Sequence, residues 1–123
     1  MNIKDKLATM NIINTWDILM RFGQKGKDVA VTYTRRADGR GGWGDVNKSQ
    51  VFSPSHETDP KSHFSDYGSK SFVGDKAKSM PLALAWAGKT YGVTEWVTCP
   101  TCRNTKIPRY VLNALMDMVK GIP

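Results

Sequence analysis

The 123-residue sequence contains only two cysteines and two histidines, and this scarcity limits the structures that it can form. Two cysteines cannot build the disulfide framework of a small secreted domain. No apolar run approaches the roughly 18 residues of a membrane-spanning helix. Residues 1–10 also lack the apolar stretch of a secretory signal. We therefore expect a protein that makes no membrane contact and resides in the cytoplasm or another reducing compartment. If the source is viral, this is a compartment of the host cell.

Familiar catalytic motifs are also missing from the sequence. It has no nucleophile elbow, no phosphate-binding Walker loop and no His-Glu-x-x-His zinc motif. The glycine-rich run at 39–42 lacks the spacing of a dinucleotide fingerprint. A small metal-dependent nuclease would have to use the imidazoles and carboxylates of one loop, His56, Asp59, His63 and Asp66. The sequence therefore favours a non-enzymatic protein, with such a nuclease as an alternative.

Hydrophobic periodicity and turn residues predict an α+β fold in one domain, 1–123. The clearest strand is 29–34, which is β-branched and aromatic. We expect a small antiparallel sheet with two to three helices packed on one face. The expected segments are a helical N-terminus at 1–22, a basic hairpin at 28–52, an irregular loop at 53–75, a helix at 80–91, a Cys-x-x-Cys knuckle at 96–106 and a C-terminal helix at 107–120.

Capping residues predict where two of the helices begin. Asn14 suits an N-cap and Asp17, three residues later, favours the positive end of a helix dipole. Ser79 followed by Pro81 predicts the start of the helix at 80–91. The C-terminal helix is expected to bury one apolar face, formed by Ile107, Val111, Leu115 and Met118.

Positive charge dominates the chain, with 18 Lys and Arg residues against 11 Asp and Glu and a formal net charge of +7. A basic domain attracts polyanions, chiefly nucleic acid. Arginines contact phosphates, and aromatic rings stack on unpaired bases. The predicted nucleic-acid-binding residues are Tyr33, Arg35, Arg36, Arg40, Trp43, Lys106 and Arg109. An exposed arginine-rich turn without a ligand, or a loop that docks an acidic protein, would have the same composition.

The two cysteines form a Cys-x-x-Cys pair, Cys99-Pro100-Thr101-Cys102, which is a common half of a tetrahedral zinc site. These four residues resemble one half of many zinc-ribbon and treble-clef modules, although the sequence has no second cysteine pair. The two cysteines and the two histidines of the chain together make one Cys2His2 ligand set. We therefore expect a structural zinc ion bound by Cys99, Cys102, His56 and His63, which would hold the loop at 53–75 against the C-terminal half. Three alternatives for the cysteine pair remain open. The first is a metal that is shared between two chains, or that Asp59 or Asp66 binds in place of a histidine. The others are a redox dithiol and two free structural thiols.

Together these features predict a small, basic, intracellular nucleic-acid-associated protein with a structural zinc knuckle. Single-stranded nucleic acid or RNA is the favoured partner, because Tyr33 and Trp43 flank the arginines in the segment at 32–43. The alternative is an interaction protein, of the kind that phages or mobile elements encode, that binds and inhibits or modulates a larger host complex. Small size and the irregular segment at 53–75 motivate that alternative.

Overall fold

The computed structural model describes residues 2–24, 27–36, 46–54 and 70–121, with the backbone alone at 35, 36 and 46. In chain order its elements are α1 (Ile3–Thr9), α2 (Thr15–Phe22), β1 (Ala30–Arg36), β2 (Val46–Phe52), β3 (Lys70–Val73), α3 (Lys76–Tyr91), β4 (Trp96–Thr98), β5 (Thr105–Pro108) and α4 (Arg109–Val119). Within these described ranges, no helix is long and apolar enough to cross a lipid bilayer.

The strands form one five-stranded sheet in the order β3-β2-β1-β5-β4. Every neighbouring pair is antiparallel, and β1 pairs with β2 from Ala30↔Phe52 to Arg36↔Val46. Together with the four helices this sheet confirms the predicted α+β fold. Within the segment predicted as a basic hairpin, 28–52, β1 and β2 pair as antiparallel strands.

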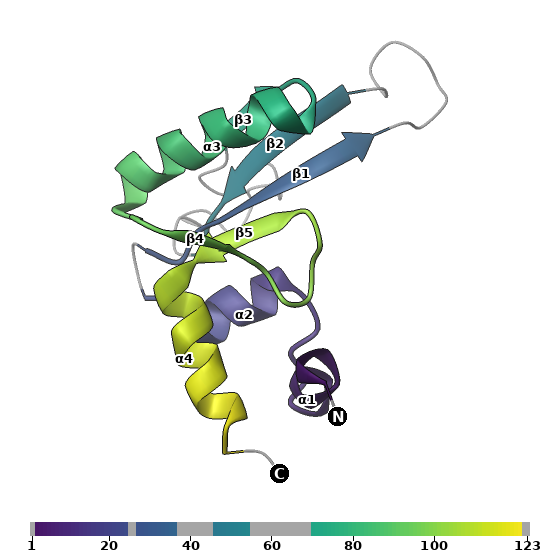
Figure 1. Ribbon diagram of the computed structural model, residues 1–123, viewed down its shortest axis with the longest axis vertical. Helices are drawn as coiled ribbons and strands as arrows, with labels where there is room; N and C mark the ends of the chain where they lie inside the picture. The colour runs from purple at the N-terminus through teal and green to yellow at the C-terminus, as the bar shows by residue number, and fades with distance from the viewer. Residues whose placement is uncertain (1, 25–26, 37–45, 55–69, 122–123) are drawn as a thin grey trace, which may run out of the picture.

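Helices cover both faces of this sheet, so the prediction that they pack on one face was wrong (Figure 1). The cause is the alternation of side chains along a strand, because apolar residues point to both sides of β1. On the α3 face lie Val29, Val31, Val51, Met80, Ala83, Ala87, Tyr91 and Val93. The opposite cluster, under α1, α2 and α4, contains Leu7, Ile12, Ile18, Leu19, Ala30, Cys99, Ile107, Val111, Leu115 and Val119.

The predicted cap of α2 is confirmed, and two other helix starts are corrected. Asn14 Oδ1 accepts from the Asp17 N–H at 3.0 Å, and the Asp17 carboxylate accepts in return from the Asn14 N–H. α3 begins one turn before the predicted Ser79, because Asp75 caps it by accepting from the Lys78 N–H at 2.9 Å. α4 begins at 109 rather than 107, since 107 and 108 still belong to β5.

The segment expected to be irregular, 53–75, is partly regular. Residues 70–73 form β3, which pairs with β2 from Lys48↔Val73 to Val51↔Lys70 and makes one edge of the sheet. The four-residue strand carries too short an alternation to stand out in the sequence. The remaining part of the loop, 55–69, lies outside the described residues, and so do both predicted histidine ligands.

Candidate functional site

Four chain segments meet at one end of the sheet. The Gly74 N–H donates to the Asn47 carbonyl at 2.8 Å, which ties the start of α3 to β2. The Tyr33 N–H donates to the Asn104 carbonyl at 2.8 Å, and Lys76 Nζ reaches the Asn104 side chain at 3.0 Å. The end of β1, the starts of β2 and α3 and the β4–β5 turn therefore lie together, on the right of Figure 1.

This end of the sheet is strongly basic, and we call it the basic end. It carries Arg35, Arg36, Lys48, Lys76, Lys78 and Arg103. Lys76, Lys78 and Arg103 are exposed. Among the described residues of these segments the one carboxylate is Asp75, and it accepts the backbone N–H of Lys78. In the described part of the chain, none of the three exposed cations forms an ion pair.

The structure brings some of the predicted nucleic-acid-binding residues together and separates others. The backbone of β1 places Arg35 and Arg36 at the basic end. Lys106 lies opposite Val31 near the start of β1, away from Arg35 and Arg36, and its Nζ donates to Thr98 Oγ1 at 2.9 Å. The half-buried Tyr33 ring packs against the apolar cluster under α3, which removes much of its surface from a stacking role. Arg40 and Trp43 lie outside the described residues.

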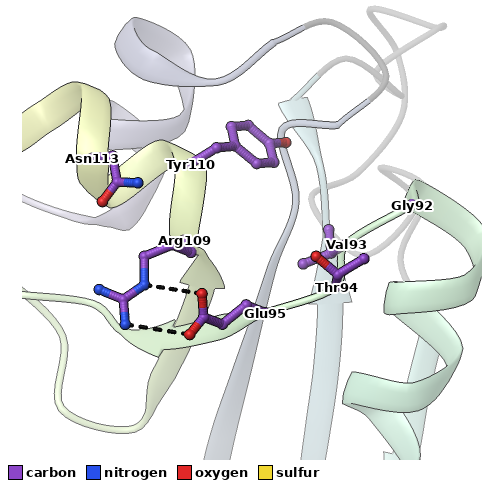
Figure 2. Close-up of a pocket in the computed structure, with 7 residues that line it drawn as sticks. All are labelled: Gly92, Val93, Thr94, Glu95, Arg109, Tyr110 and Asn113. Carbon is purple, nitrogen blue, oxygen red and sulfur yellow. Dashed lines mark hydrogen bonds and ion pairs between the residues drawn. The ribbon is translucent and has the colours of Figure 1, made fainter.

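Arg109 lies at the far end of β5 from this basic surface, so we leave it out of the site. Its Nε and Nη2 donate to the two carboxylate oxygens of Glu95, at 3.2 and 3.4 Å (Figure 2). The pair lines a pocket of about 210 Å³ together with Tyr110 and Asn113. Because Glu95 neutralises the guanidinium, this pocket offers an anion no net positive charge.

Sequence reasoning missed Lys48, Lys76, Lys78 and Arg103. These residues are spread over more than 50 positions of the sequence. They become neighbours through the pairing of β2 with β3 and through the hydrogen bonds to Asn104. The sequence pattern does not predict β3, and without this strand the four residues cannot be placed together.

The cysteine pair lies in the turn between β4 and β5, directly against the start of α2. Cys99 Sγ lies 3.1 Å from Thr15 Oγ1 and 3.3 Å from Thr101 Oγ1. The same Thr101 hydroxyl lies 3.6 Å from Cys102 Sγ. Cys99 is only 3% exposed and belongs to the core cluster under α2 and α4, whereas Cys102 is partly exposed.

The surroundings of Cys102 favour its thiolate. Burial raises the pKa of this thiol, but hydrogen bonds from Thr15, Thr101 and Cys99 outweigh burial and leave the pKa below its ordinary value. One of these bonds comes from the backbone N–H of Thr15, the first residue of α2. A donor at the positive end of a helix is a common means of stabilising a thiolate.

Zinc binding by the cysteines stays a prediction. Within the residues that the structure describes, no group of three or more His, Cys, Asp or Glu side chains could hold a metal ion. His56 and His63 lie outside them, as do the alternative ligands Asp59 and Asp66. The described surroundings of the two sulfurs consist of hydroxyl and backbone groups rather than of further metal ligands.

Comparison of the chain with models of known protein families, with curated proteins and with solved structures finds no match.

Proposed function

We propose that the protein associates with nucleic acid, non-enzymatically, through the basic end of its sheet. The observation that supports this most is the convergence of six basic residues from four segments, with Asp75 as the one described carboxylate among them. A surface of this kind binds phosphates in succession and releases the counterions condensed on them.

Single-stranded nucleic acid or RNA is the proposed partner class. Phosphate contacts would come from Lys76, Lys78 and Arg103, which are exposed and project from two adjoining segments. Stacking on unpaired bases is assigned to Trp43, because the Tyr33 ring is engaged in the core. An acidic protein that modulates a larger complex would use the same surface, and it is the competing partner in the test.

The proposal is tested by replacing Lys76, Lys78 and Arg103 together with alanine. The matched control replaces two lysines and one arginine outside the basic end, Lys4, Lys89 and Arg21, which are also exposed. The logarithm of the affinity falls with the logarithm of the salt concentration, and each phosphate contact to a single strand contributes roughly 0.7 to the steepness of this fall. The variant that lacks Lys76, Lys78 and Arg103 should therefore have a slope that is shallower by about 2.

Binding is measured by fluorescence anisotropy with labelled single-stranded RNA and with duplex DNA across a salt series. We expect the basic-end variant to bind the single strand at least about tenfold more weakly at low salt, and the control variant to resemble the parent. Equal losses of affinity in the two variants would show that the nucleic acid is attracted only by the net charge of the protein, and would contradict binding at the basic end. Failure of the parent protein to bind either nucleic acid would leave the acidic protein partner as the better explanation.

A further inference from the structure

We propose that Cys102 and Cys99 form a reversible dithiol–disulfide centre that reacts with small-molecule disulfides, with Cys102 as the attacking sulfur and Cys99 as the resolving one. This inference is independent of the proposed nucleic-acid binding. It rests on the approach of both sulfurs to one hydroxyl and on the unequal exposure of the two cysteines.

The two sulfurs share one neighbour. Both approach one hydroxyl, Thr101 Oγ1, at 3.3 and 3.6 Å. Because the two cysteines share this neighbour within a turn of four residues, a small movement of the side chains brings the sulfurs into bonding distance. Because β4 and β5 flank the turn and the Cys99 N–H donates to the Thr105 carbonyl, the backbone on both sides of the pair is held in place.

The two cysteines have different roles. Cys102 is partly exposed, so a disulfide in solution can reach its sulfur. Cys99 is 3% exposed and lies behind it, with its sulfur 3.1 Å from the Thr15 hydroxyl. A buried thiol is protected from external oxidants but is well placed to attack a sulfur bonded to its neighbour.

The reaction balances as two exchange steps. The Cys102 thiolate attacks one sulfur of oxidised glutathione, which breaks the glutathione disulfide, releases one glutathione thiolate and leaves a mixed disulfide on Cys102. Cys99 then loses its proton to solvent and attacks the Cys102 sulfur, which expels the second glutathione thiolate. The protein loses two electrons and two protons, and one glutathione disulfide becomes two thiols.

The test treats the reduced 123-residue chain, freed of metal by a chelator, with oxidised glutathione. Samples are quenched with acid over time, alkylated and weighed by intact-mass spectrometry. The parent protein should lose two hydrogen atoms and retain no glutathione. Cys99→Ser should stop at the mixed disulfide, with one glutathione on Cys102. Cys102→Ser should react at least about tenfold more slowly than Cys99→Ser, because its remaining thiol is buried.

A second variant separates a specific role from a loss of folding. Thr101→Val keeps the shape of the side chain but removes the shared hydroxyl, and Thr94→Val is the matched control at an exposed position outside the turn. Mixed-disulfide formation should slow in Thr101→Val and stay unchanged in Thr94→Val, with circular dichroism confirming the fold of each. The proposal is overturned if the folded parent keeps both thiols, if it accumulates a stable glutathione adduct, or if Cys102→Ser reacts as fast as Cys99→Ser.

Discussion

Truncation of Leu115 to alanine tests the packing of α4 against the sheet, on which the two-sided architecture depends. Leu115 is 0% exposed and packs in the cluster with Leu7, Ile18 and Ile107, which come from two other helices and β5. Leu→Ala changes at such sites cost about 2–5 kcal/mol, the sum of lost burial and the cavity left behind. A domain of this size has a total stability of about 5–15 kcal/mol, so the loss should be large and easily measured.

Leu82→Ala provides the matched control, because the same atoms are removed from a side chain that is 57% exposed on α3. Urea unfolding followed by tryptophan fluorescence should show a midpoint lowered by about 1–2 M for Leu115→Ala, given slopes of about 1–3 kcal/mol/M. The midpoint of Leu82→Ala should change little. Equal shifts in the two variants, or a larger shift in Leu82→Ala, would refute the assignment of α4 as a core helix.

Two further predictions concern ionisation and metal. Burial, with a smaller contribution from Asp28, raises the pKa of Tyr110 to about 12, and its hydroxyl finds no hydrogen-bond partner among the described residues. Between pH ~10 and ~12 the folded state therefore keeps the proton of the Tyr110 hydroxyl, whereas the unfolded state loses it. The stability that Tyr110 contributes is present below pH ~10 and is lost as the pH rises toward ~12. Tyr110→Phe should unfold less readily than the parent in alkaline urea titrations, and an identical alkaline loss in both would contradict this. The zinc hypothesis predicts about one zinc per chain in untagged protein and its loss in Cys102→Ser; a content near zero in the parent would end it.

Local signals predicted several elements correctly. The capping box of Asn14 and Asp17 is determined by residues three apart, and the hairpin of β1 and β2 by two β-rich runs. The start of α3 was harder, because Asp75 and Ser79 are both good N-caps. The helix accommodates Pro81 on its exposed side, where water can satisfy the carbonyl that the proline leaves unpaired.

The face of α4 depends on contacts that the sequence does not contain. The predicted apolar stripe ended at Met118, but the structure buries Val119 and leaves Met118 38% exposed. Ile107 belongs to β5 rather than to the helix. The path of the chain from β5 through Pro108 sets the rotation of α4 about its axis, and nothing local to the helix distinguishes one stripe from its neighbour.

The candidate site was predictable only in part. The sequence marked Arg35 and Arg36 as basic residues beside a strand, and it marked the cysteines by their spacing. It did not indicate that Lys76 and Arg103 would become neighbours, or that Thr15 would lie against Cys99 across 84 positions. Such groupings arise from strand order and helix packing, which follow from tertiary contacts rather than from local pattern.

The central claim, that nucleic acid binds at the basic end of the sheet, is tested most directly by mapping amide shifts in NMR spectra. Isotope-labelled protein is titrated with a short single-stranded RNA at low salt and again at high salt. We predict that the largest changes fall at 47–48, 74–78 and 103–106 and disappear as salt is raised. Changes confined to α1, α2 and α4, or no changes at low salt, would contradict the claim.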